Sequence, residues 1–472
     1  MQFISTRGAG PCDFKTAVMS GLAEDGGLYV PEHVPDLSGR LAAWQGQPFP
    51  QVFQEVIAPF VGPAIDEAAL RAMVLRGCAR FTHPEVTPVV PVGPLYLCEL
   101  FHGPTLAFKD VALQFLGLLF ERFLEESQGR LTIVGATSGD TGSAAIHALR
   151  GRKGIEVFIL FPQGRVSPTQ ELQMTTVEDA NIHAIAVQGS FDDAQDIVKG
   201  LFNDRAFNAR FSLGAVNSIN WARVMAQITY FFYAYLRVVA LRREAGMRVG
   251  DPIQVSVPTG NFGHVYAAIL ARRMGLPVSR LIVATNANAI LHRFLERGEY
   301  RKGTVVQTLS PSMDIQVASN FERYLFDLAG RDGRQVTAWL EALRGAGGFR
   351  LDGAPWERAR RELRSAAVDD EATLATIAEV HRRWGYLLDP HSAVGVRAAL
   401  DLPAPGEPTL CMATAHPAKF SAAIARAVGF DPPLPPALAG LDQLPTRVQV
   451  LPARLDSVQT YINATIRAIV DL

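Results

Sequence analysis

Short apolar runs alternate with longer helical segments from about residue 95 onward. Runs such as LTIVGA at 131–136 and EVFILF at 156–161 are apolar without a break, which is typical of parallel strands buried on both faces. The pattern predicts strands at 95–100, 131–136, 155–161, 182–187, 253–257, 281–284 and 409–413. Because strands alternate with crossover helices in this way, we expect an α/β fold that binds ligands at the carboxyl ends of its strands.

Three stretches lie outside that alternation. Residues 1–90 carry turn-rich sequence such as LAEDGGLYVPEHVPDL and lead into the proline-spaced HPEVTPVVPVG at 83–93, which indicates an N-terminal domain. The region 300–400 is mainly helical and carries no chemical motif that we recognise. The most apolar stretch, 224–241, contains glutamine, threonine and arginine, so a helix buried in the core is predicted there rather than a membrane span.

Length and charge narrow the class of protein. A chain of 472 residues is longer than one hydrophobic core usually supports, so two or three domains are expected. A hydrophobic fraction of 48% with 19% charged residues is typical of globular proteins and excludes global disorder. The formal net charge of -1 provides no basic field for a nucleic-acid backbone, so a small-molecule partner is expected instead.

Cysteine spacing and the first residues bear on the compartment. The four cysteines lie far apart and form no C-x-x-C pair, which fits reduced thiols in a cytoplasm. The opening MQFISTRGAGPCDF has no positively charged leader before an apolar run, so no secretory signal is expected. Neither H-E-x-x-H nor a paired cysteine–histidine spacing occurs, and no metal site is predicted. We expect a cytoplasmic monomer or homodimer without a membrane partner.

A lysine precedes a very apolar helical segment. The sequence FHGPTLAFKD ends at Asp110 and is followed by VALQFLGLLFERFLEE, so Lys109 is predicted at the start of a buried helix. Desolvation and a positive helix N-terminus both disfavour an ammonium and raise the fraction of reactive amine. Taken alone, the segment fits better a first-turn lysine that reaches solvent or pairs with Asp110; the motifs that follow reverse this interpretation.

A loop of small and hydroxyl residues follows the second predicted strand. Residues 135–143 read GATSGDTGS. The small residues leave backbone N–H groups accessible, and Thr137, Ser138 and Thr141 add hydroxyl donors at a helix N-terminus, which suits an anion such as a carboxylate. A tight turn capped by serine or aspartate is the equally probable alternative for such a loop taken alone.

A second loop has the features of a phosphate cup. Residues 258–264 read PTGNFGH between a strand and a helix. Gly260 and Gly263 let the backbone approach a ligand, and Asn261, Phe262 and Gly263 can direct N–H groups at a phosphate. The chain has neither the Walker lysine motif nor G-x-G-x-x-G, which argues against ATP and NAD.

A hydroxyl follows the last predicted strand. In CMATAHPAKF at 411–420, Thr414 can offer a neutral hydroxyl to a heteroaromatic ring nitrogen and leave that nitrogen unprotonated. A helix-capping role is the more frequent one for such a hydroxyl.

Amides and a guanidinium begin the most apolar helix. The sequence NSINWAR at 217–223 places Asn217 and Arg223 where they can surround a substrate phosphate. A structural ion pair of Arg223 is an equally good interpretation.

Taken together, FHGPTLAFKD, TSGDTGS, NSINWARV, PTGNFGHVYA and TAHPAKF, in this order and spacing, resemble the threonine synthases of the fold-type II pyridoxal-phosphate enzymes. The opening, STRG with GLAEDGGLYVPE, is similar to the longer bacterial and fungal type. The resemblance implies a tryptophan synthase β-like α/β fold with two parallel-sheet halves around the cofactor and an additional N-terminal domain. The expected domains are 1–90, a smaller half at 91–225, and a larger half at 226–472 with a helical insertion around 300–400.

The resemblance also implies residue roles. Lys109 matches the lysine that forms the Schiff base with pyridoxal 5'-phosphate, and it is also the catalytic base. The cofactor phosphate is implied at Gly260, Asn261, Phe262 and Gly263, and the pyridine nitrogen at Thr414. Substrate binding is implied for Thr137, Ser138, Asp140 and Thr141 at the carboxylate and for Asn217 and Arg223 at the phosphate. Many fold-type II relatives have asparagine at the position of Asp140.

The implied reaction converts O-phospho-L-homoserine and water to L-threonine and phosphate, by γ-elimination followed by β-addition of water, as the last step of threonine biosynthesis. Two alternatives stay open, ahead of other fold-type II chemistries such as dehydration of threonine or cysteine synthesis, which give no reason for Asn217 and Arg223. A synthase-like phospholyase would release a keto acid, ammonia and phosphate from the same substrate. A catalytically silent protein that binds pyridoxal phosphate is the second, and the presence of Lys109 and of both phosphate loops argues against it.

Overall fold

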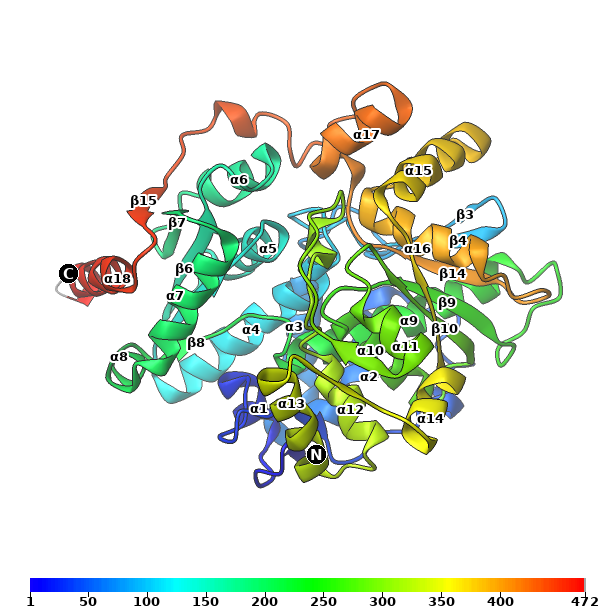
Figure 1. Cartoon of the computed structure of the whole chain (residues 1–472), viewed down its shortest axis with the longest axis horizontal. Helices are drawn as coiled ribbons and strands as arrows, with labels where there is room; N and C mark the ends of the chain where they lie inside the picture. Colours follow the sequence, from blue (N-terminus) through cyan, green and yellow to red (C-terminus); the bar gives the residue numbers. More distant parts are fainter. Residues whose placement is uncertain (471–472) are drawn as a thin grey trace. The chain divides into compact units, whose positions relative to one another are not determined.

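The computed structural model describes residues 1–470 and divides into two compact units. Unit 1 comprises Met1–Ala112 and Ser218–Pro433, and unit 2 comprises Leu113–Asn217 and Leu434–Leu472 (Figure 1). These units differ from the predicted domains in two ways. Residues 1–90 belong to unit 1 instead of forming a separate domain, and residues 434–472 belong to unit 2 instead of the larger half. The three predicted domains stay a prediction.

Unit 1 is built on a six-stranded sheet of order β13-β10-β9-β14-β4-β3. Its strands are β3 (Val89–Val92), β4 (Leu95–Glu99), β9 (Ile253–Pro258), β10 (Val278–Thr285), β13 (Leu363–Ala367) and β14 (Thr409–Ala413). All neighbouring strands are parallel except β3, which pairs antiparallel with β4. The carboxyl ends of five strands therefore lie along one edge of the sheet.

Helices from the last part of unit 1 cover this sheet. The helices α15 (Asp370–Trp384), α16 (Pro390–Asp401) and α17 (Ser421–Val428) share an apolar cluster with β4 and β14. Leu97 and Ala413 of the strands pack there with Val396 and Ile424 of the helices. Further along, α10 (Gly263–Arg273) contacts β10 and the long helix α9 (Trp221–Leu241).

The helix α9 is the buried core helix that the sequence predicts. It is long and apolar enough to cross a membrane by length and composition alone, and 83% of its most apolar window is buried inside the structure. Its aromatic side chains at 230–233 and 235 are all buried. Burial of that apolar surface is the main stabilising contribution to the core of unit 1.

The N-terminal segment is part of unit 1. It contains β1 (Phe3–Ser5), α1 (Phe14–Ser20), β2 (Tyr29–Pro31), α2 (Phe49–Val61) and α3 (Glu67–Cys78). Strands β1 and β2 pair antiparallel, and α2 packs on α9. Arg7 forms a two-pronged ion pair with Glu322, and the buried Arg323 donates to the backbone oxygen of Tyr29 over 2.9 Å. These bonds tie the segment to α12 (Phe321–Leu328).

Residues 300–400 are mainly helical, as predicted, but contribute the strands β12 and β13 as well. The elements there are α12, α13 (Gly333–Gly345), β12 (Gly348–Arg350), α14 (Ala354–Glu362), β13, α15 and α16, with a short helical turn at Pro311–Met313. Strand β13 extends the sheet by pairing with β10. The sequence pattern missed it because RELRSAA has no apolar run that distinguishes a strand from the preceding helix.

Unit 2 holds a five-stranded sheet of order β15-β7-β6-β5-β8. Its strands are β5 (Leu131–Ala136), β6 (Ile155–Pro162), β7 (Ile182–Gln188), β8 (Leu213–Gly214) and β15 (Gln449–Pro452), and all pairs are parallel. Its helices are α5 (Asp140–Leu149), α6 (Pro168–Thr175), α7 (Phe191–Asn203), α8 (Arg205–Phe211) and α18 (Leu455–Val470). In Figure 1 the red strand β15 lies beside β7 although it is far along the chain.

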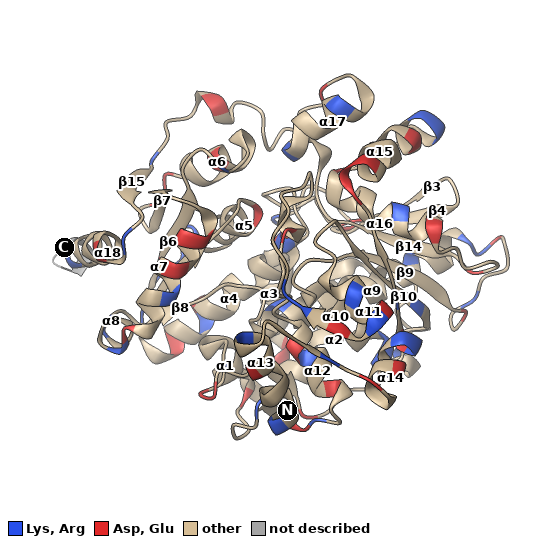
Figure 2. Ribbon diagram, in the orientation of Figure 1, with Lys and Arg blue, Asp and Glu red and all other residues tan. Residues whose placement is uncertain are grey.

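All seven predicted strands are confirmed, with ends within three residues of the predicted ones. They were readable because both faces of each strand are buried, so the apolar run is continuous. Lys and Arg are interspersed with Asp and Glu over both units, in keeping with the formal net charge of -1 (Figure 2).

Candidate active site

Lys109 is the first residue of α4 (Lys109–Ser127), as predicted. The loop before it is bound to the end of β14: Phe108 N donates to Thr414 O over 2.8 Å, and His416 N donates to Leu106 O over 3.1 Å. The Lys109 side chain is 8% exposed, and its Nζ donates to Ser312 Oγ over 3.3 Å. A buried amine is therefore fixed at the carboxyl edge of the sheet, beside the end of β14.

The neighbouring carboxyl group, Asp110, is held by the same loop. Its Oδ2 accepts from Thr105 N over 2.8 Å and its Oδ1 accepts from Thr105 Oγ1 over 2.7 Å. Lys419 Nζ donates to Thr105 O over 2.8 Å, which adds a cation nearby. Complete burial raises the pKa of Asp110 from its ordinary 3.8 to about 6, against the opposing effect of the Thr105 bonds.

We expect Asp110 to make the free energy of unfolding depend on pH. Its pKa is higher in the folded chain than in the unfolded one, so its stabilising effect is complete below about pH 4 and is lost as pH rises through about 6. At about 1.4 kcal/mol for each pKa unit, this loss amounts to roughly 3 kcal/mol. Because Asn cannot titrate, the stability of Asp110→Asn relative to wild type should improve between about pH 4 and pH 7.

Urea unfolding of both chains at intervals across this range measures the effect. A stability difference between wild type and Asp110→Asn that does not change with pH would contradict it.

The predicted phosphate loop forms the start of α10. Helix α10 begins at Gly263, with Phe262 as its N-cap residue at a φ of 64°. A Cβ atom on Gly260 would lie 2.7 Å from Ser312 O, and one on Gly263 would lie 3.1 Å from Asn320 Nδ2. Glycine is needed at Gly260 because another backbone approaches it so closely. The turn leaves N–H groups at the positive end of α10, where a phosphate binds well.

Phe262 contributes its backbone rather than its ring to this loop. The left-handed conformation of a bulky residue is strained by roughly 1–3 kcal/mol. Its ring is 1% exposed and packs 5.1 Å from the Phe321 ring and 5.7 Å from the Tyr324 ring. Burial of the ring offsets the strain and holds the loop open for a ligand.

Thr414 directly follows β14 and is 5% exposed. Its N–H donates to Ser392 Oγ over 2.9 Å, and its carbonyl accepts from Phe108 N. Thr414 does not cap the following helical turn. The N-cap of that turn is His416, whose side chain accepts from Ala418 N. The structure thus fixes the Thr414 backbone from both sides, next to the loop that carries Lys109.

The start of α12 connects two of the predicted motifs, and sequence reasoning missed it. Asn320 N donates to Asn261 O over 3.0 Å, and Asn320 Nδ2 donates to Ser218 O over 3.2 Å. Ser319 Oγ lies 3.4 Å from both Asn261 Oδ1 and Ser218 Oγ. The phosphate loop and the NSINWAR segment therefore meet at Ser319 and Asn320. The available signal was Ser-Asn before the apolar, glutamate-containing segment FERYL, which is a helix-start pattern.

The NSINWAR segment begins α9. Asn220 is the N-cap, and its side chain also donates to Val18 O over 2.8 Å. Arg223 in the first turn is 3% exposed, and burial lowers its pKa to about 10. Desolvation disfavours this guanidinium, so an anion bound beside it would be stabilising. Asn217 is exposed and is the last residue of the first segment of unit 2.

In unit 2, the loop GATSGDTGS links β5 to α5. Thr137 Oγ1 accepts from Gly139 N over 3.0 Å and from Gly142 N over 2.9 Å, so this hydroxyl organises the loop. Ser138 and Thr141 are half-buried and present the remaining hydroxyls. Asp140 is the first residue of α5, and its Oδ1 accepts from Gln170 Nε2 over 2.9 Å. The loop is the predicted helix N-terminus, with Thr137 as an acceptor inside it.

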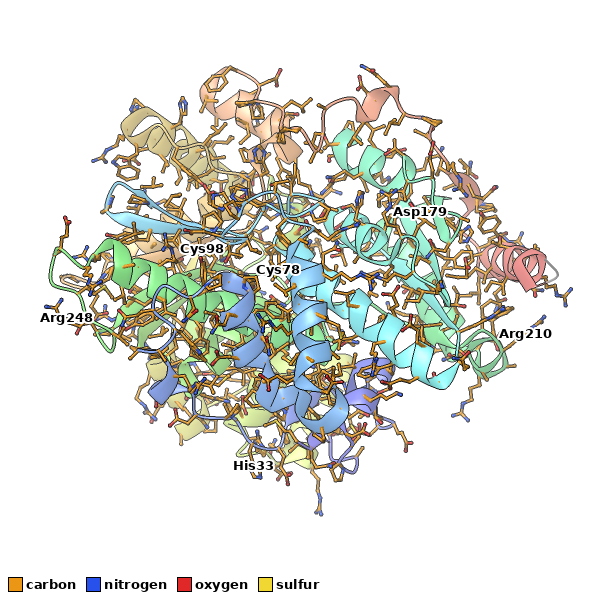
Figure 3. The ribbon with its side chains drawn as sticks, turned by 180° about the vertical axis from the view of Figure 1, so that it is seen from behind. His33, Cys78, Cys98, Asp179, Arg210 and Arg248 are labelled. Carbon is orange, nitrogen blue, oxygen red and sulfur yellow. The ribbon has the colours of Figure 1, made fainter. Side chains whose placement is uncertain are left out.

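The cysteines are not among the candidate site residues. All four cysteines are free, and Figure 3 marks Cys78 on α3 and Cys98 on β4. Burial raises the pKa of Cys78 to about 12, which leaves it an unreactive thiol. Among residues 1–470, no group of three or more His, Cys, Asp and Glu side chains is placed to hold a metal ion.

The residues of unit 1 fit a phosphorylated aldehyde cofactor. Lys109 supplies a buried amine, the start of α10 supplies a glycine-lined phosphate cradle, and Thr414 supplies a neutral hydroxyl at a strand end. All of these belong to one unit, so their arrangement does not depend on the placement of unit 2. This donor set suits pyridoxal phosphate, which needs an amine, an anion site and a partner for its ring nitrogen.

Three family models match the chain. A model described as a pyridoxal-phosphate dependent enzyme covers residues 81–412. A model of the threonine synthase N terminus covers 2–78, and one of the threonine synthase C-terminal part covers 392–462.

Relatives and solved structures agree with these matches. Threonine synthase of Pseudomonas aeruginosa is 47% identical over 98% of both chains, and that of Schizosaccharomyces pombe is 44% identical over 90% of this chain and 88% of its own. Threonine synthase-like 2 of Homo sapiens is 36% identical over 96% of this chain and 94% of its own. The crystal structure of threonine synthase from Brucella melitensis, titled as bound to PLP, has a TM-score of 0.94 with 45% identity, covering 98% of this chain and 99% of its own. The yeast enzyme has a TM-score of 0.93 with 39% identity, covering 99% of both chains.

Proposed function

Because this chain belongs to the threonine synthase family of pyridoxal-phosphate-dependent enzymes, we propose that it uses Lys109 to convert O-phospho-L-homoserine and water into L-threonine and phosphate. Its activity is that of a lyase that breaks the carbon–oxygen bond to phosphate at Cγ and later adds water at Cβ. The observation that carries the assignment of Lys109 is its buried amine, which donates to Ser312 Oγ. The backbone oxygen of Ser312 approaches Gly260 of the glycine-lined loop, and Phe108, the residue before Lys109, is bonded to Thr414.

Bound pyridoxal 5'-phosphate supplies an aldehyde carbon for an amine and a ring that accepts electrons from the substrate. Lys109 Nζ would hold this group, and the free Lys109 amine would be the base that takes the Cα proton of the substrate. Ser312 Oγ, at 3.3 Å from Nζ, accepts a hydrogen bond from the protonated amine.

Two further elements of unit 1 hold the cofactor in this proposal. Backbone N–H groups at Gly260, Asn261, Phe262 and Gly263 bind its phosphate at the positive end of α10. The hydroxyl of Thr414 would be the partner of the ring nitrogen and would leave it unprotonated, since a neutral hydroxyl does not stabilise a pyridinium as a carboxylate would.

The substrate's two anionic groups are assigned to separate motifs. Arg223 and Asn217 bind the substrate phosphate, because a guanidinium and an amide both donate hydrogen bonds to phosphate oxygens. Ser138, Asp140 and Thr141 bind the substrate carboxylate, in a loop that Thr137 shapes. In this role Asp140 acts through its backbone at the start of α5, while its side chain is bound by Gln170.

Gly139→Ala tests the carboxylate loop. The residue has a φ of 135°, and its added Cβ would lie 2.3 Å from Gln170 Oε1. Either the Gln170 side chain or the loop must therefore shift, and Gln170 also binds Asp140 of the loop. We expect KM for O-phospho-L-homoserine to rise about 10-fold or more, which corresponds to about 1.4 kcal/mol of lost binding. Cofactor absorbance should stay unchanged, because the cofactor residues belong to unit 1.

Gly164→Ala is the matched control for that change. Gly164 also has a positive φ, of 67°, in unit 2, but no atom lies within 4 Å of an added Cβ. Its φ lies in the left-handed region that alanine can enter at a small cost, whereas the φ of Gly139 lies outside it, and no collision occurs. KM should therefore stay near the wild-type value. Equal KM values for the two variants would refute the assignment of the loop.

Product analysis tests the reaction itself. The purified protein is incubated with O-phospho-L-homoserine, and threonine, phosphate, ammonia and keto acid are assayed together. Threonine and phosphate in equal amounts would establish the synthase reaction. Ammonia in proportion to phosphate would assign a phospholyase on the same fold, and a cofactor band without any product would indicate a silent binding protein.

We propose a cytoplasmic location, with the small-molecule substrate as the partner and a monomer or homodimer as the assembly. Support comes from the four free cysteines and from the near-neutral charge.

A further inference from the structure

Hydrogen bonds join Lys109 to a buried histidine–aspartate pair that the proposed reaction leaves without a role. Beyond the bond from Lys109 Nζ, the Ser312 backbone N–H donates to His391 Nε2 over 3.2 Å. His391 Nδ1 lies 2.8 Å from Asp389 Oδ2. Asp389 is 1% exposed and His391 is 4% exposed, so the pair is shielded from solvent.

The carboxylate of Asp389 is also connected to Thr414, through Ser392. Ser392 Oγ donates to Asp389 Oδ1 and accepts from the Thr414 backbone N–H over 2.9 Å. One buried carboxylate is therefore connected on one side toward Lys109 and on the other side to Thr414.

The partners determine which atoms carry hydrogen in this network. A backbone N–H can only donate, so His391 Nε2 must present a lone pair to Ser312. The hydrogen of the ring then resides on Nδ1 and is donated to Asp389. Likewise, Ser392 Oγ accepts from Thr414 and must turn its own hydrogen toward Asp389.

Asp389 consequently accepts four hydrogen bonds. They come from the His391 backbone N–H at 2.9 Å, His391 Nδ1, the Ser392 backbone N–H at 3.1 Å, and Ser392 Oγ. The residue is the N-cap of α16, which accounts for the two backbone bonds. Capping does not account for the two side-chain bonds, which lead to Ser312 and Thr414.

His391 fixes one side of the segment that carries Ser312. The other side is fixed by Asn286, whose Nδ2 donates to Ser310 Oγ over 3.0 Å and to Asp314 Oδ1 over 2.8 Å. The same segment also confines the phosphate loop, because Ser312 O is the atom that a Cβ on Gly260 would meet. A small movement of this segment would change both the contact with Lys109 and the space at Gly260 in the phosphate loop.

We propose that Asp389 and His391 are positioning residues that hold the Ser312 hydroxyl against the Lys109 amine and, through Ser392, hold the backbone of Thr414. The inference rests on the proposed role of Lys109. An oxygen held beside Nζ accepts from this nitrogen and favours its protonated form, so Ser312 stabilises the lysine after it has taken the Cα proton. Release of Ser312 would make the nitrogen lose its proton at a lower pH.

Other titratable groups surround the pair and are the same in wild type and in every variant, so their own titration contributes equally to each. Tyr386 and His416 interact with the charge of Asp389, and Asp110 lies next to Lys109 with Lys419 nearby. None of them is altered in the variants described next, so a change in proton affinity at Nζ reports on residues 312, 389 and 391.

The test compares His391→Leu, His391→Gln and Ser312→Ala with wild type. Leucine removes both ring nitrogens, whereas the glutamine amide can still accept from the Ser312 N–H. The first readout is the pH midpoint of the visible band of the bound cofactor. The second uses the cofactor-free chain, in which reductive methylation of Lys109 is followed against pH by peptide mass spectrometry. Asp332→Asn is the control, since Asp332 is the N-cap of α13 and lies outside the network.

We expect the midpoint to fall by about 0.5 to 1 pH unit in His391→Leu and in Ser312→Ala, the size that loss of one hydrogen bond produces. A double variant that combines His391→Leu with Ser312→Ala should shift no further than the larger single shift, because both changes release the same contact. His391→Gln should return toward the wild-type midpoint, and Asp332→Asn should not move it. Methylation of Lys109 should reach half its plateau at a correspondingly lower pH.

A wild-type midpoint in a folded His391→Leu, or shifts that add in the double variant, would overturn the proposal. If His391→Leu does not fold, Asp389→Asn replaces it in the test. The amide of asparagine has one oxygen and can no longer accept from both His391 and Ser392, so we expect the same fall in the pH midpoint. An unchanged midpoint would refute the proposal. A wild-type chain that forms no visible band with pyridoxal phosphate would refute the assignment of Lys109 instead. The methylation experiment uses the cofactor-free chain, so it still tests the positioning role in that case.

Discussion

Lys109→Ala is expected to abolish the visible absorbance band of the bound cofactor and to lower kcat by about 10³-fold or more. The residue has two roles in the proposed reaction, as the amine that holds the cofactor and as the base at Cα. Loss of a general base alone typically lowers the rate by about 10²–10⁴-fold. The chain should still fold, because Lys109 begins α4 and removal of its buried amine leaves the apolar face of the helix intact.

The measurement combines absorbance spectra, product assays and circular dichroism on purified wild type and variant. Lys302→Ala provides the control for loss of a lysine, because Lys302 is exposed and has no place in the site. It should keep both the band and the rate. A Lys109→Ala chain that keeps the band and substantial activity would refute the assignment of the cofactor lysine.

Gly260→Ala is expected to weaken cofactor binding by about 10- to 100-fold. The added Cβ would lie 2.7 Å from Ser312 O and 3.2 Å from Met313 Cα, and both neighbours are backbone atoms. Forcing such atoms apart typically costs about 1–3 kcal/mol. At about 1.4 kcal/mol for each factor of ten, this cost corresponds to a roughly 10- to 100-fold weaker dissociation constant when only the cofactor-bound state is strained. The free loop can relax, whereas a phosphate in the cradle requires the original backbone.

Titration of the cofactor-free chain with pyridoxal phosphate gives the dissociation constant directly. Gly345→Ala is the matched control, because this glycine is in the same unit and no atom lies within 4 Å of an added Cβ. Its dissociation constant should equal that of wild type. Should Gly260→Ala bind the cofactor as tightly as Gly345→Ala, the phosphate cradle would have to lie elsewhere.

The N-terminal segment shows how remote residues support the site. Val18 and Tyr29 accept hydrogen bonds from Asn220 and Arg323, which lie at the beginnings of α9 and α12. Those two helix starts meet the phosphate loop through Asn320. The segment contains none of the proposed site residues, yet it anchors both helices whose starts surround the loop.

The sequence by itself determined seven of the strands, the buried core helix and most of the motifs of the candidate site. Each of these has a local signal. A strand buried on both faces is a continuous apolar run, a phosphate loop needs small residues, and Lys109 stands where a polar loop meets an apolar helix. Five motifs in a fixed order then indicated the family, because their combination is far more specific than any one of them.

Only the tertiary structure decided which parts of the 300–400 region belong to the site. Ser312, Asn320 and His391 are separated from Lys109 by roughly two to three hundred residues, and each looks ordinary within its own segment. Their roles arise from long-range contacts, such as Ser312 with Lys109 and Asn320 with Asn261. Hydrogen bonds between side chains of distant segments leave no periodicity or spacing in the sequence, because the packing of the sheet and its helices brings them together.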